Sequence, residues 1–114
     1  MLQPDAPPMR TISPEELKEM LDRGANAPRL IDVREPWEFA ICRIAGAENI
    51  PMEELPARVG ELDRDRETVF ICHHGTRSQR VAHDLESMGF SRTLNLDGGV
   101  DAWAQSVDPD MQQY

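Results

Sequence analysis

Residues 69–80 read VFICHHGTRSQR, and the organisation of the whole chain follows from this stretch. Three apolar, strand-forming residues lead directly into Cys72, and a short loop that contains Gly75 then leads to Arg77. Beyond the loop, apolar side chains recur every three or four residues, as in an amphipathic helix, and Gly89 is a typical helix stop. The stretch therefore predicts a strand, a tight loop and a helix, with a thiol at the carboxyl end of the strand.

Cys72 has the setting of a nucleophile. In an open α/β sheet, ligands and chemistry gather at the carboxyl ends of the strands. Backbone N–H groups of a tight loop, with the positive end of the following helix, stabilise a thiolate or an anion attached to it. The dipole contributes only about 0.3–1 kcal/mol, so hydrogen bonds to sulfur and nearby cations must supply the rest. The local candidates are His73, His74, Arg77 and Arg80. A buried, inert cysteine is the alternative, and the loop favours the nucleophile.

Composition excludes several classes of protein. A length of 114 residues predicts one domain with its own core. The net charge of −9 argues against binding to nucleic acid or to anionic membranes, and no apolar run is long enough to span a bilayer. The first residues lack the pattern of a secretory signal, and the only two cysteines, Cys42 and Cys72, lack metal-type spacing. We expect a cytoplasmic monomer that needs no metal.

The chain divides into a lead-in at residues 1–9, a folded domain at residues 10–106 and a frayed tail at residues 107–114. The lead-in is rich in proline and poor in apolar residues. Within the domain, short apolar strands alternate with helical patterns, which predicts a parallel α/β sheet with helices on both faces. The expected strands are residues 10–12, 29–34, 48–51, 69–71 and 92–96.

A charged group sits within the second apolar run. Asp32 lies inside that run, and a buried carboxylate needs a partner. Arg34 and Glu38 are close enough to pair across the start of the next helix. We interpret these three residues as a hydrogen-bonded brace for the loop, with the alternative that Arg34 faces the site, where Arg43 and Arg77 would add positive charge. Cys42 is expected to be a small buried hydrophobe.

Four segments resemble the rhodanese family in their order and spacing. They are LIDVREPWEF at residues 30–39, GAENIP at 46–51, CHHGTRS at 72–78 and GGVDAW at 98–103. The resemblance covers nearly the whole predicted domain and implies a five-stranded parallel sheet with helices on both faces. It also implies a persulfide-forming nucleophile, Cys72, inside the loop formed by residues 72–77. Family members often carry histidine where this chain has Arg43.

The resemblance implies a sulfurtransferase of the thiosulfate type. The Cys72 thiolate would attack the outer sulfur of a donor such as thiosulfate, expel sulfite, and pass the sulfur to a thiol or protein acceptor. Arg77 would bind the anionic end of the donor, and no organic cofactor is required. The expected substrate-binding loop residues are His73, His74, Gly75, Thr76 and Arg77, and the possible supporting residues are Asp32, Arg34, Arg43 and Ser78.

Other functions use the same elements. A sulfur carrier or binding module would keep the fold with little turnover, and a phosphatase or arsenate reductase would use the same thiolate and loop. Counted inclusively, the loop from Cys72 to Arg77 has six residues, one fewer than in the cell-division-cycle phosphatases, which share the fold by resemblance. The narrower ring suits a single outer sulfur. A metal site formed by Cys72 and the histidines is a weaker alternative, because adjacent residues rarely chelate one ion well.

Overall fold

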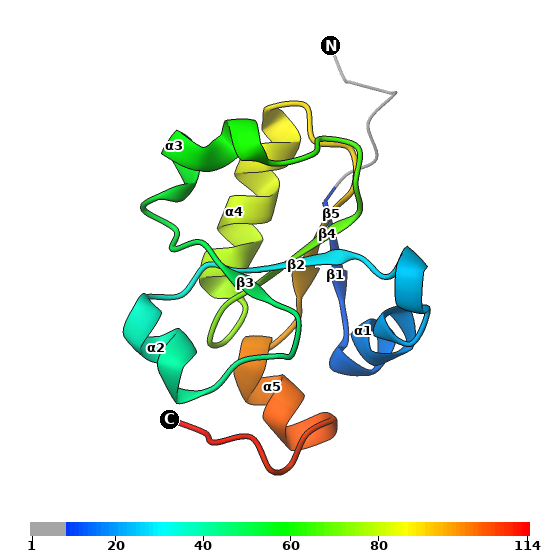
Figure 1. The fold of residues 1–114 in the computed structure, drawn as a ribbon, viewed down its shortest axis with the longest axis vertical. Coiled ribbons are helices and arrows are strands. Elements are labelled where there is room, and N and C mark those ends of the chain that lie inside the picture. Colours follow the sequence, from blue (N-terminus) through cyan, green and yellow to red (C-terminus); the bar gives the residue numbers. More distant parts are fainter. Residues whose placement is uncertain (1–8) are drawn as a thin grey trace.

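Five parallel strands form one sheet in the centre of the molecule, in the order β1-β5-β4-β2-β3 (Figure 1). The coordinates are a computed structural model, which describes residues 9–114. The strands are β1 (Arg10–Ile12), β2 (Arg29–Asp32), β3 (Glu48–Asn49), β4 (Thr68–Ile71) and β5 (Thr93–Leu96). Every pairing is parallel. The predicted five-stranded parallel α/β sheet is therefore confirmed.

Helices cover both faces of this sheet. They are α1 (Pro14–Leu21), α2 (Pro36–Ile41), α3 (Leu55–Arg58), α4 (Thr76–Ser87) and α5 (Gly99–Ser106), with short 3₁₀ turns at Gly24–Asn26 and Val59–Glu61. The predicted capping box starts α1: the Ser13 hydroxyl accepts from the Glu16 N–H at 3.1 Å, and the Glu16 carboxylate accepts from the Ser13 N–H at 3.0 Å. Within the described part of the chain, every helix is too short or too polar to cross a bilayer.

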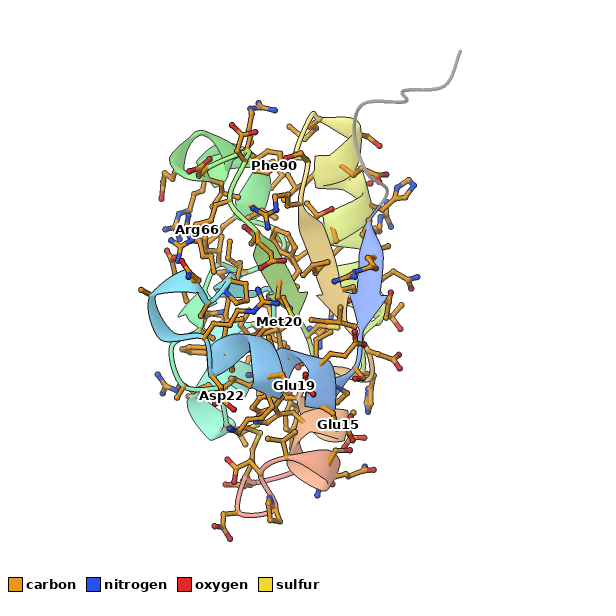
Figure 2. All side chains as sticks on the ribbon, turned by 90° about the vertical axis from the view of Figure 1, so that its right-hand side faces the viewer. Glu15, Glu19, Met20, Asp22, Arg66 and Phe90 are labelled. Carbon is orange, nitrogen blue, oxygen red and sulfur yellow. The ribbon has the colours of Figure 1, made fainter. Side chains whose placement is uncertain are left out.

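Alternating residues of the strands feed two separate cores. Val69 and Ile71 of β4 pack on one face with residues of α1 and α5, whereas Phe70 packs on the other face with residues of α3 and α4. Helix α1, at the front of Figure 2, illustrates the division: Met20 is buried against the sheet. The other labelled residues of this region, Glu15, Glu19 and Asp22, are exposed.

The N-terminus of α5 approaches the Cys72 loop closely. The Val100 N–H donates to the Cys72 carbonyl at 2.9 Å, and the Asp101 N–H donates to the His73 carbonyl at 3.1 Å. Gly99 has a φ of +60°, and a Cβ built on it would lie 2.2 Å from the Cys72 carbonyl oxygen. Only glycine lets these backbones approach so closely. Helix α5 therefore fixes the start of the loop.

The two ends of the chain depart from the predicted boundaries in different ways. Residues 1–8 of the predicted lead-in lie outside the described residues. The tail at residues 107–114 forms no helix or strand, but it is not frayed: Val107 and Met111 pack against the core. Its last residue, Tyr114, lies beside α2, where Figure 1 shows the C-terminus. The prediction of a frayed tail is wrong, because its apolar side chains find surfaces to cover.

We expect Gly99→Ala to lower the free energy of unfolding by more than about 2 kcal/mol, because a left-handed alanine and a backbone clash are both unfavourable. Urea unfolding followed by circular dichroism measures the change. Gly60→Ala is the matched control, since a Cβ there meets nothing within 4 Å, and it should shift stability by less than about 1 kcal/mol. Equal stabilities of the two variants would contradict the close packing of α5 on the loop.

Candidate active site

The Cys72 sulfur lies buried inside its loop. Cys72 directly follows β4, and the residue is only 1% exposed. Its Sγ accepts hydrogen bonds from the Gly75 N–H at 3.0 Å and from the Ser78 hydroxyl at 3.2 Å. Gly75 has a φ of +99° and packs against the Gly98 backbone, which bends the loop back toward the sulfur. Donors from the loop and from α4 therefore converge on one sulfur atom.

Ser78 links the sulfur to the neighbouring strand. Its hydroxyl lies 2.5 Å from Oδ1 of Asn95 in β5, and both residues are buried. A hydroxyl carries one proton, so it serves either the sulfur or the amide oxygen at a given moment. A negative charge on Cys72 would draw that proton toward the sulfur. Sequence reasoning missed Asn95, although a polar residue between Leu94 and Leu96 is a recognisable signal.

Arg77 is held by a carboxylate from another helix. Its two terminal nitrogens donate to the two oxygens of Glu38 at 2.8 and 2.9 Å, while its side chain stays 37% exposed. The hydrogen bond from Arg77 outweighs the effect of burial and lowers the pKa of Glu38 from its usual 4.5 to about 2. The predicted pairing of Arg34 with the Glu38 side chain is wrong. Arg34 instead donates to the Glu38 backbone carbonyl at 3.2 Å.

Arg34 forms the predicted brace with Asp32 and does not face the sulfur. The side chain is fully buried, and it binds both Asp32 oxygens, with the shortest contact at 2.7 Å. It also donates to the Cys42 carbonyl at 2.6 Å and to the Tyr114 hydroxyl at 2.8 Å. Burial opposes its charge, but the hydrogen bonds to Asp32 and Tyr114 outweigh this and raise the pKa of Arg34.

The two remaining predicted side chains, those of Arg43 and Thr76, are exposed. Arg43 is exposed and stacks over the Phe39 ring, with its guanidinium carbon 4.4 Å from the ring centroid. Thr76 is exposed at the start of α4. Cys42 is buried at the end of α2 and packs in the core on the α1 and α5 side of the sheet, as predicted. The structure therefore does not bring Arg43 to the loop.

The two histidines of the loop form an aromatic stack with Tyr114. The His73 ring lies 3.9 Å from the His74 ring and 3.9 Å from the Tyr114 ring. Burial and the nearby His74 lower the pKa of His73, so that its ring is mostly uncharged at neutral pH. The predicted positive contribution from His73 is therefore small.

Among residues 9–114, one group of side chains near the loop could hold a divalent ion. Ligand atoms of His73, His74 and Asp101 lie within 4.8 Å of one another. The two rings are inclined by only 29°, and ring nitrogens bind metals in the plane of the ring. Two nearly parallel rings therefore direct their lone pairs side by side rather than at one point. Cys72 does not belong to this set of candidate ligands.

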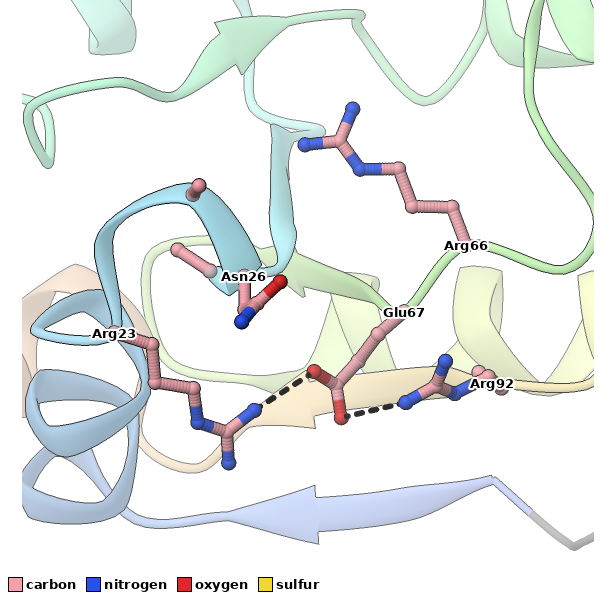
Figure 3. A pocket seen from close by; sticks show the side chains of 7 residues that line it. Arg23, Asn26, Arg66, Glu67 and Arg92 are labelled. Carbon is pink, nitrogen blue, oxygen red and sulfur yellow. Dashed lines mark hydrogen bonds and ion pairs between the residues drawn. The ribbon is translucent and has the colours of Figure 1, made fainter.

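A hollow lies at the other end of the strands from the Cys72 loop, near the amino ends of β2, β4 and β5. It measures about 430 Å³ and is lined by Arg23, Ala25, Asn26, Ala27, Arg66, Glu67 and Arg92. Figure 3 shows Glu67 between two of the arginines, with ion pairs of 3.3 Å to Arg23 and 3.7 Å to Arg92. These charges are partly matched, and none of the lining residues is a thiol or hydroxyl nucleophile. The Cys72 loop is the better candidate for chemistry.

Known proteins share this fold and much of this sequence. A family model described as the rhodanese-like domain matches residues 13–106. The thiosulfate sulfurtransferase GlpE of Pseudomonas fluorescens is 34% identical over 104 residues, which cover 91% of this chain and 93% of that protein. The probable adenylyltransferase/sulfurtransferase MoeZ of Mycobacterium tuberculosis is 41% identical over 106 residues, which are 91% of this chain but only 27% of that protein. A crystal structure of a rhodanese-like domain protein from Staphylococcus aureus has a TM-score of 0.79 and 29% identity, covering 93% of this chain and 99% of that one.

The buried Glu38 carboxylate should make stability depend on pH. Its pKa is about 2 in the folded chain and about 4.5 when unfolded, so its contribution is complete above pH 4.5 and is lost as the pH falls toward 2. We expect Glu38→Gln to cost about 2 kcal/mol at pH 7, and this difference from the wild type should shrink through that window. Urea unfolding between pH 7 and pH 2 measures it. The exposed Glu19→Gln serves as control, and a Glu38→Gln deficit that persists at pH 2 would refute the charge argument.

Proposed function

The chain belongs to the rhodanese-like domain family, and we propose that it transfers sulfur through a persulfide on Cys72. The observation that carries this proposal is the buried Sγ, which faces the Gly75 N–H and the Ser78 hydroxyl at the carboxyl end of β4. Such donors stabilise negative charge on sulfur without a metal. The same donors would serve the resting thiolate and, one bond further out, the terminal sulfur of a persulfide.

The reaction has two steps that share one covalent intermediate. In the first step, the Cys72 thiolate attacks the outer sulfur of thiosulfate; a sulfur–sulfur bond forms, the bond within the donor breaks, and sulfite leaves with its electron pair. In the second step, a nucleophilic acceptor such as cyanide or a thiolate attacks the terminal sulfur. The persulfide bond breaks, and its electron pair returns to Cys72 as thiolate. Two easier displacements replace one difficult transfer.

Arg77 and Ser78 have separate roles in this proposal. Glu38 fixes the Arg77 guanidinium at the edge of the loop. The exposed part of Arg77 would attract the sulfonate end of thiosulfate while the outer sulfur of the donor enters the loop. The Ser78 hydroxyl would donate its single proton to Cys72 when the cysteine carries a negative charge, and to Asn95 otherwise. The loop from Cys72 to Arg77 has six residues, which suits one sulfur atom better than a tetrahedral phosphate.

We expect Cys72, and not Cys42, to carry the sulfur. After incubation with thiosulfate, mass spectrometry should find one extra sulfur atom on Cys72, and cyanide should remove it. Cys72→Ser should abolish thiosulfate:cyanide transfer. Cys42→Ser should keep most of it, because Cys42 packs in the other core, where its sulfur contacts Arg34 and not the loop. A folded Cys42→Ser protein without activity would overturn the assignment. Stable sulfur loading with negligible turnover would identify a carrier instead of an enzyme.

Removing the Arg77 charge should weaken binding of the anionic donor. We expect Arg77→Ala to raise KM for thiosulfate roughly fivefold, about 1 kcal/mol for a partly exposed charge contact, and Arg77→Lys to fall between it and the wild type. Arg80→Ala is the control, since its side chain is 77% exposed one turn away. Added salt should raise the wild-type KM as well. Robust hydrolysis of aryl phosphates by the wild type, lost in Cys72→Ser, would refute the argument from loop length.

A further inference from the structure

Tyr114 brings the tail of the chain back to the active-site loop. Its hydroxyl donates to a Glu38 carboxylate oxygen at 2.9 Å and accepts from the Arg34 guanidinium at 2.8 Å. Its ring lies parallel to the His73 ring, with an interplanar angle of 7°. Trp37 meets the same ring edge-on at 6.2 Å. A residue 76 positions away from Glu38 thus contacts both α2 and the loop itself.

These contacts hold the Tyr114 side chain in one place. A phenol has one proton to donate and can accept as well, and both capacities are used here. Burial raises the pKa of Tyr114 to about 12, so the hydroxyl keeps the proton that it donates to Glu38. The ring adds a stacked aromatic contact with His73, the residue next to Cys72. The side chain is therefore docked, although it remains 37% exposed.

The segment around Tyr114 can release this side chain without breaking a strand pairing, and the Arg34 Nη1 would keep the Glu38 carbonyl at 3.2 Å as an acceptor. Residues 107–114 contain no helix or strand, and Gln112 and Gln113, which precede Tyr114, are exposed. Movement of Tyr114 would break two hydrogen bonds and two aromatic contacts, but no strand pairing. It would uncover His73 and extend the exposed surface of Trp37, which is already 62% exposed. The docked and released forms differ in how much room they leave beside the loop.

We propose that Tyr114 determines which sulfur acceptors reach Cys72, by covering the side of the loop formed by His73 and Arg77. Small reactants reach the sulfur while Tyr114 is docked, whereas bulky ones require it to leave. This proposal rests on the proposed sulfur transfer for its biological meaning, but its geometry does not depend on that reaction. Tyr114 touches neither the sulfur nor the reacting atoms, and it acts by occupying space.

Alkylation of Cys72 tests the covering role without any sulfur transfer. In a Cys42→Ser background Cys72 is the only thiol, so rate constants for a small reagent, iodoacetamide, and for a maleimide carrying a polyethylene glycol chain can be followed by mass spectrometry. Tyr114→Ala should raise the ratio of the bulky to the small rate constant by about fivefold or more, because the docking hydrogen bonds and the ring are lost. Tyr114→Phe, which keeps the ring but loses both hydrogen bonds, should give a smaller increase.

The controls distinguish covering from a general change in reactivity. The exposed Gln113→Ala should leave the ratio unchanged. If Tyr114→Ala and Tyr114→Phe change both rate constants equally, or change neither, the proposal is overturned. Failure of Cys72 to accept sulfur from thiosulfate would refute the proposed function, while the alkylation ratio would still report whether Tyr114 covers the loop.

Discussion

A guanidinium that water cannot reach requires an acceptor for each of its donors, and Arg34 meets this requirement with groups from three parts of the chain. Asp32 at the end of β2, the carbonyls of Glu38 and Cys42 in and after α2, and the Tyr114 hydroxyl surround it. Loss of Asp32, the charged partner of this buried guanidinium, would cost about 3–5 kcal/mol, so β2 and α2 cannot drift independently. Because α2 is fixed in this way, Glu38 is in place to hold Arg77, and the far end of the loop gains a defined position.

The electrostatics of the loop differ from what a count of charges suggests. Two histidines and an arginine near Cys72 indicate a positive site, but the pKa of His73 is lowered and Arg77 is paired with Glu38. The groups that contact the sulfur directly are instead a backbone N–H and a hydroxyl, those of Gly75 and Ser78. This arrangement suits a chain with a net charge of −9, because short hydrogen bonds act at close range, where the overall charge has little influence.

Sequence patterns predicted the sheet, the strand before Cys72, the loop and the capped first helix, because each depends on residues close together in the chain. They also indicated the Asp32–Arg34 brace, whose members are two positions apart. Sequence patterns failed where partners are remote: Glu38 and Arg77 are separated by 39 positions, and Arg34 and Tyr114 by 80. Local spacing suggested Arg34 for Glu38, and only the sheet order, which sets β2 beside β4, brings Arg77 to that carboxylate. Nothing in the polar tail distinguished Tyr114 as a docked residue.

The two cysteines belong to opposite faces of the sheet. Cys42 packs with Val69 and Ile71, whereas Cys72 packs with Phe70 on the other side. A disulfide needs two Cβ atoms within about 4.5 Å, so a bond between these thiols would require at least one of them to leave its core. Cys42 therefore cannot serve as a resolving thiol, and any sulfur or oxidant adduct on Cys72 can be released only by a molecule that arrives from outside.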